Sequence, residues 1–156
     1  MDEIKKILSE NIFDWYPSNY PSKSFIDTAM NHVNINDLIS VAGLLAPEFI
    51  EHEDHVFFKE NVKTLLEKKK IFPCPYGYKD KKEIERYYNL FHLGEFFLAT
   101  QNEASNDTRM LYKFGKLLIY FWRKRLKELF PNKSFSFEIE YDLYDEHGLC
   151  LTFWQE

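Results

Sequence analysis

The sequence predicts an α+β fold, with about five helices around one long central helix at 106–130. Residues 117–122 read Leu-Leu-Ile-Tyr-Phe-Trp, which is apolar on nearly every side of a helix and typical of one buried at the centre of a domain. Two further segments, 49–58 and 134–154, read as β-hairpins. The chain has 5 glycines, a low number that argues against a turn-rich β-sandwich.

The composition predicts a single globular domain over residues 1–156. The chain is 45% hydrophobic and 18% aromatic, which is enough apolar material for a substantial core. A chain of 156 residues fits one domain, and the sequence contains no repeat, low-complexity run or interdomain linker.

The first half of the chain predicts two helices and a hairpin. Residues 2–12 suit a short amphipathic helix, and 13–21, with two prolines and four aromatic residues, suit an extended arm. The next helix begins at Asn34, a good N-cap, and runs to Ala46, where Pro47 stops it. Because this helix is almost entirely apolar, we expect it to be buried. The hairpin at 49–58 then turns at 53–54.

The second half predicts three helices and a second hairpin. Residues 59–70 form a lysine-rich helix, 71–78 a proline-containing loop, and 80–99 a helix with one apolar stripe. The long helix follows and ends before Pro131. Apolar and polar residues alternate in the strand from 134 to 141, and the return strand covers 149–154. An isolated hairpin is marginal in water, so the two hairpins could combine into one small antiparallel sheet against the long helix.

The long helix also carries a basic stripe and one misplaced charge. At about 100° per residue, six basic residues fall within one arc of roughly 100° that includes Tyr120. They are Arg109, Lys113, Lys116, Arg123, Lys124 and Lys127. Such a stripe can bind phosphate or an acidic protein surface. The alternative is that it is simply the face that a core helix exposes to solvent. Arg125 points to the apolar side, so we predict a buried ion pair with Glu95, the alternative being an arginine that reaches water.

The motifs of common cofactor and metal sites are absent from the sequence. There is no glycine-rich phosphate loop, no Gly-x-Ser-x-Gly, no His-Glu-x-x-His and no paired Cys-x-x-Cys. We therefore expect no cofactor, no metal and, since these absences lower the odds of catalysis, a protein that is not an enzyme. His52 and His55 flank a predicted turn, but zinc requires three or four protein ligands.

Localisation follows from the cysteines and the apolar runs. Cys74 and Cys150 are isolated and no signal peptide precedes them, which predicts reduced thiols in the cytoplasm. The longest apolar run has six residues, far below the ~20 needed to span a bilayer.

Charge patterning points to a protein partner. The net charge of -5 disfavours nucleic acid and anionic membranes and suits a basic protein. We expect the contact surface to lie on the acidic hairpins, at Glu138, Glu140, Asp142, Glu51 and Asp54.

Two other functions remain open on the sequence. One is a small enzyme or ligand-binding protein with a pocket near the 72–78 loop and helix 80–99, formed by Tyr76, Tyr78, His92 and Glu95. The other is a single-strand platform that combines the lysines at 68–70 and 79–82 with nearby aromatic residues, against which the net charge argues.

Two stretches resemble small uncharacterised bacterial proteins. One is 44–51 with 56–58, and the other is 122–126 with 130–131 and 151–155. The matched positions are mostly apolar, so the resemblance implies a shared α+β fold. The small, acidic, motif-poor format is also similar to immunity proteins that neutralise a bacterial toxin. The resemblance implies a non-catalytic protein-binding module that neutralises a partner, for example a basic toxin, by stoichiometric contact.

Overall fold

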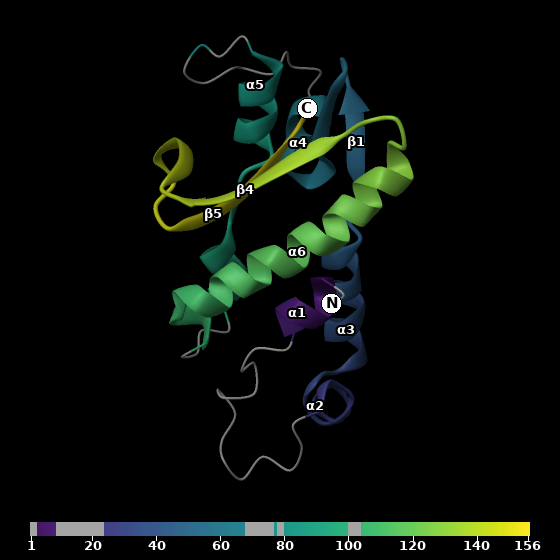
Figure 1. The fold of residues 1–156 in the computed structure, drawn as a ribbon, viewed down its shortest axis with the longest axis vertical. Coiled ribbons are helices and arrows are strands. Elements are labelled where there is room, and N and C mark those ends of the chain that lie inside the picture. Colours follow the sequence, from purple (N-terminus) through teal and green to yellow (C-terminus); the bar gives the residue numbers. More distant parts are fainter. Residues whose placement is uncertain (1–2, 9–23, 68–76, 78–79, 100–103) are drawn as a thin grey trace.

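The computed structural model describes residues 3–8, 24–67, 77, 80–99 and 104–156, and it confirms the α+β class (Figure 1). Its helices are α1 (Glu3–Leu8), α2 (Phe25–His32), α3 (Ile35–Leu45), α4 (Lys59–Glu67), α5 (Lys81–Tyr88) and α6 (Thr108–Leu129). Its strands are β1 (Phe49–His52), β2 (His55–Phe58), β3 (Phe91–His92), β4 (Phe135–Tyr141) and β5 (Leu149–Gln155). Short 3-10 turns cover 93–97, 104–106 and 143–145.

The long helix α6 is the predicted spine of the fold. It crosses the molecule diagonally beneath β4 and β5 (Figure 1). Its buried face consists of Gly115, Leu118, Trp122 and Leu126. Gly115 permits close packing, because a Cβ at this position would lie 2.8 Å from Ile139 Cδ1 and 2.9 Å from the corresponding atom of Leu93.

The two hairpins form as predicted, but they belong to separate sheets. In the first hairpin β1 pairs with β2, and the turn residues Glu53 and Asp54 both have positive φ, as a tight two-residue turn requires. The second sheet has the order β3-β5-β4, with Phe137 opposite Phe153 in its register. The expectation of one combined sheet is therefore replaced by a two-stranded and a three-stranded antiparallel sheet.

One aromatic core spans both sheets and α6. Phe49 of the first sheet packs edge-on against Phe153 of the second, with ring centroids 5.3 Å apart. Trp122 of α6 contacts Phe58 at 5.7 Å and Phe91 at 5.0 Å. The sheets thus share a hydrophobic core although their strands do not pair with each other.

Two buried polar side chains, one in α5 and one at its C-cap, bridge the edges of the two sheets. The first is Glu85, whose carboxylate accepts hydrogen bonds from the backbone N–H of Val56 in β2 at 2.8 Å and of Gln155 in β5 at 2.6 Å. The Gln155 side chain donates to the same carboxylate. Glu85 is fully buried, so these donors take the place of water around the group.

Asn89 provides the second bridge, one helical turn later. Its Oδ1 accepts from the Phe58 N–H at 2.9 Å. Its Nδ2 donates to the Val56 carbonyl at 2.9 Å and to the Phe153 carbonyl at 3.2 Å. Glu85 and Asn89 therefore supply the hydrogen bonds that a strand between β2 and β5 would otherwise make.

The predicted helix at 80–99 is wrong beyond Tyr88. Asn89 caps α5, Phe91 and His92 then pair with Leu151 and Cys150 as β3, and a 3-10 turn follows at 93–97. The apolar stripe continues in the sequence, but the Asn89 side chain is committed to the two sheet edges, and strand pairing replaces the helix.

The N-terminal helices differ from expectation in two ways. The Asn34 cap is confirmed, since its Oδ1 accepts from the Asp37 N–H at 2.9 Å, but residues 35–43 of α3 are exposed and the predicted burial of this helix is wrong. Helix α2 was not predicted. The arm at 13–21, together with residues 9–12 and 68–70 of two predicted helices, lies outside the described residues.

Replacing Asn89 by alanine should destabilise the fold strongly. The change leaves one backbone N–H and two carbonyls buried without partners, and each such group costs about 1–3 kcal/mol. We expect the free energy of unfolding to fall by roughly 3 kcal/mol or more in urea denaturation. Asn132→Ala, at an exposed position after α6, is the matched control and should change it by less than about 0.5 kcal/mol. Equal effects of the two changes would contradict the bridging role.

Candidate functional site

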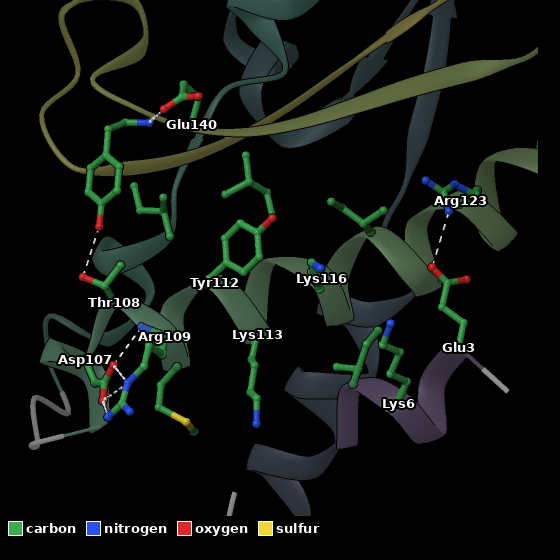
Figure 2. Close-up of a pocket in the computed structure, with 16 residues that line it drawn as sticks. Glu3, Lys6, Asp107, Thr108, Arg109, Tyr112, Lys113, Lys116, Arg123 and Glu140 are labelled. Atoms are coloured by element: carbon green, nitrogen blue, oxygen red, sulfur yellow. Dashed lines mark hydrogen bonds and ion pairs between the residues drawn. The ribbon is translucent and has the colours of Figure 1, made fainter. Parts of the chain in front are cut away.

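A groove runs along the flank of α6, between α1 and the end of β4 (Figure 2). Its volume is about 930 Å³. Five basic side chains line it, namely Lys6, Arg109, Lys113, Lys116 and Arg123, together with the acidic Glu3, Asp107 and Glu140. Apolar side chains complete the lining, among them Ile119, Ile139 and Leu149. Four residues of the predicted basic stripe therefore lie in one concave surface.

Ion pairs hold the two ends of this groove. At the N-terminal end of α6, Arg109 bonds the Asp107 carboxylate at 2.7 Å, which lowers the pKa of Asp107 and raises that of Arg109. At the other end, Arg123 Nη1 lies 3.7 Å from Glu3 Oε1 of α1. Both arginines are thus oriented by carboxylates of the chain itself.

Between these ends, the groove combines aromatic and cationic side chains. The Tyr112 ring points towards β4, and Lys113 extends away from β4 (Figure 2). The ammonium group of Lys116 lies 4.9 Å from the centroid of the Tyr112 ring. A carboxylate entering the groove here would meet a cation beside an aromatic surface.

A second candidate surface is the apolar exterior of α2 and α3. Eight large apolar side chains are exposed on these helices and at the joint between them: Phe25, Ile26, Met30, Val33, Ile35, Leu38, Ile39 and Val41. The exposed fractions of Met30, Ile35 and Ile39 are 78%, 73% and 64%. Among the described residues, the core holds the C-terminal end of α3, where the Trp122 indole N–H donates to the Leu44 carbonyl at 2.8 Å. Figure 1 shows α2 at the opposite end of the molecule from α5.

Glu51 and Asp54, two of the acidic residues predicted to contact a partner, form ion pairs with lysines of the chain. Lys133 lies 2.9 Å from Glu51 and 3.4 Å from Asp54, and Lys81 lies 2.9 Å from Asp54. Lys81 and Lys133 lower the pKa of Asp54. Burial opposes the charge of Lys133, yet Glu51 and Asp54 raise its pKa.

Glu138 belongs to a cluster around Arg86 that sequence reasoning missed. The Arg86 guanidinium bonds Glu138 and also Glu83 at 3.0 Å, and it lies 5.2 Å from the Trp154 ring centroid. Burial alone would raise the pKa of Glu83, but hydrogen bonds from Tyr144 and Arg86 lower it. The partners of Arg86 come from α5 itself and from β4, so this cluster fastens α5 to the second sheet.

The two remaining acidic candidates lie at the far end of β4. Glu140 lines the groove and accepts from the Tyr141 N–H at 2.9 Å. Asp142 accepts from the Gly148 N–H at 2.9 Å and shapes the turn to β5.

The predicted alternative pocket is only partly described, because Tyr76 and Tyr78 lie outside the described residues. Both nitrogens of His92 contact backbone groups. Nε2 bonds the His147 carbonyl, and Nδ1 accepts from the Glu95 N–H at 3.2 Å. The His92 ring therefore caps the 3-10 turn at 93–97.

The predicted buried ion pair of Glu95 with Arg125 is wrong. Arg125 Nη1 instead bonds Glu128 on the same helix at 2.9 Å, and Glu95 is exposed. The physical reason is the break at Asn89, because it removes Glu95 from the apolar stripe on which the prediction placed it.

His52 and His55 lie opposite each other in the first hairpin. Within the described part of the chain, no group of three or more potential ligands could hold a metal ion. Across the same residues, no helix combines the length and apolar character needed to cross a membrane. Comparisons of the chain with protein-family models, curated proteins and solved structures found no match.

Cys150 should be unreactive in the folded protein. It is buried in β5, and burial raises the pKa of its thiol, which keeps the group protonated at neutral pH. In a Cys74→Ser background, we expect negligible reaction with a chromogenic disulfide reagent at pH 8 under native conditions and complete reaction in denaturant. Rapid native reaction would mean that the thiol is accessible.

Proposed function

We propose that this chain is a non-catalytic protein-binding module that acts by stoichiometric contact through the apolar surface of α2 and α3. The observation that supports the proposal is the mismatch between the sequence of α3 and its environment. The helix is composed as a buried helix, yet residues 35–43 are exposed. Soluble proteins rarely expose a contiguous apolar patch of this kind unless it is an interaction site.

The charge distribution on the two helices indicates the kind of partner. Residues 25–45 contain Asp27 and Asp37 as their acidic residues and no lysine or arginine. Apolar burial would therefore provide most of the binding free energy, with polar contacts at the rim. The partner is a protein with a complementary apolar groove or helix face.

An immunity-like role, in which the partner is a toxin, fits this mode of action and remains part of the proposal. The acidic residues of the hairpins are weaker evidence for a basic partner than the exposed apolar residues of α2 and α3 are for an apolar partner. Glu51, Asp54 and Glu138 already have basic partners within the chain, so their charge is largely matched.

The double variant Ile35→Glu/Ile39→Glu tests the surface. Each isoleucine contributes about 2 kcal/mol when a partner buries it, so the loss of both, about 4 kcal/mol, should weaken binding by several hundredfold or more. A partner retained by the immobilised wild-type chain from an extract of the source organism would be purified and titrated by calorimetry, with a 1:1 complex expected. Both positions are exposed, so the fold should be retained, as circular dichroism can verify.

The matched control is Thr64→Glu/Asn132→Glu, which adds the same charge at exposed positions remote from α2 and α3. This control should bind as the wild type does. A partner that binds the Ile35→Glu/Ile39→Glu variant with unchanged affinity would contradict the proposed contact surface.

A further inference from the structure

The outer edge of β4 borders the groove beside α6. In the order β3-β5-β4, β4 is an edge strand. Its hydrogen bonds to β5 fall at even-numbered residues, since Glu156 N–H donates to the Ser134 carbonyl and Asp142 N–H donates to the Gly148 carbonyl. In an antiparallel ladder the residues between these positions direct their backbone groups to the other side. The N–H and carbonyl groups of Phe137 and Ile139 therefore face away from β5.

At one end of this edge, a side chain already accepts the hydrogen bond of an outward-facing N–H group. The Tyr141 N–H, which belongs to the same outward-facing set, donates a hydrogen bond to the Glu140 carboxylate at 2.9 Å. The Tyr141 hydroxyl donates to Thr108 Oγ1 at 3.1 Å and ties this end of β4 to the start of α6. The outward-facing backbone groups of Phe137 and Ile139 lie next to the groove, away from this tied end.

The side chains beside this edge have a consistent chemistry. Arg123 of α6 lies 5.5 Å from the Phe137 ring centroid, and Ile139 lines the groove together with Ile119. Lys116 and Tyr112 lie further along the same flank of α6. The backbone of an extended chain placed along β4 would lie beside the apolar side chains of Ile119 and Ile139. Its side chains that point towards α6 would lie near the cations Lys116 and Arg123.

We propose that this groove is a second protein-binding site, which accepts an extended acidic peptide segment as an additional strand on β4. Strand addition satisfies the backbone groups of Phe137 and Ile139, and the cations of α6 select carboxylates on the side of the added strand that faces the helix. The site is separate from the apolar surface of α2 and α3, and it does not depend on the function proposed for that surface.

A peptide fits this groove better than a nucleic acid does. Glu3, Asp107 and Glu140 lie among the basic residues and would repel a continuous polyphosphate, and the net charge of the chain is -5. A strand edge recognises peptide backbone specifically, whereas a nucleic acid offers no matching ladder of donors and acceptors. Discrete carboxylates on alternate residues can contact Lys116 and Arg123 while avoiding the acidic positions.

The test uses a fluorescein-labelled octapeptide of alternating Glu and Thr and measures fluorescence anisotropy against the full chain. In an extended peptide all glutamates lie on one side, and threonine favours strands without adding charge. We expect saturable binding that weakens with salt, and little binding of the matched Lys-Thr peptide. Lys116→Glu should weaken binding about tenfold or more, whereas Lys63→Glu, an exposed charge reversal on α4, should change it less than about twofold.

Two N-methylated peptides separate strand addition from simple charge attraction, and both use the wild-type chain. Only every second N–H of an added strand bonds the edge. Methylation of one alternate set of amides should abolish binding, and methylation of the other set should preserve it. Backbone amide exchange at Phe137 and Ile139 should slow when the unmodified peptide is bound.

Three results would overturn the proposal. The two methylated peptides could bind with equal affinity, the Lys-Thr peptide could bind as tightly as the Glu-Thr peptide, or an oligothymidylate with the same number of charges could bind more tightly than the Glu-Thr peptide. The Ile35→Glu/Ile39→Glu variant should bind the acidic peptide as the wild type does, so failure of one proposed site leaves the other distinguishable.

Discussion

The fold depends on the hydrogen bonds that Glu85 and Asn89 make to two sheets that do not pair with each other. Glu85 lies in α5 and Asn89 is the C-cap of this helix four residues later, so the two side chains project from the same side, one turn apart. Together they satisfy backbone groups of Val56 and Phe58 in β2 and of Phe153 and Gln155 in β5. Without them, these groups would be buried unsatisfied or the sheets would separate enough to admit water. The side chains of Glu85 and Asn89 therefore make the hydrogen bonds that a strand between the two sheets would make. Water is then not needed to satisfy these backbone groups, and the aromatic core can exclude it.

The same arrangement determines which sheet edge remains available. On one side of the second sheet, β5 is covered by β3 at Cys150 and Leu151 and by the side chains of α5 further along. Arg86 reinforces this closure through Glu138. The opposite edge is formed by β4, and α6 packs obliquely beneath it with Gly115 close to Ile139. The close packing at Gly115 brings the solvent-facing flank of α6 beside the strand edge, so the basic stripe and the available backbone groups of β4 border one groove.

The parts of the fold that sequence could predict are those fixed by local rules. The helix α6, the two hairpins and the Asn34 cap depend on periodicity, turn residues and neighbouring hydrogen bonds, and all are present. The break after Tyr88 was missed because Asn89 is committed to partners in strands 31 to 64 residues away in sequence. The exposure of α3 was missed for a related reason, since apolar composition reports what a helix can bury, whereas its exposure depends on which other elements pack against it. The basic stripe was visible in the sequence, but the contributions of α1 and β4 to its groove were not.

The two proposed contact surfaces, the exterior of α2 and α3 and the groove of α6 and β4, would contribute to binding through different interactions. The α2 and α3 surface is apolar and poor in charge, so it would supply free energy with little directional preference. The groove of α6 and β4 offers cations and an ordered row of backbone groups, which fix the direction and register of a bound segment. Trp122 connects them, because its ring packs in the core beneath the sheets while its indole N–H holds the C-terminal end of α3. A partner that used both surfaces would gain affinity chiefly from the first and specificity chiefly from the second, and it would have to span the distance between them to engage both at once.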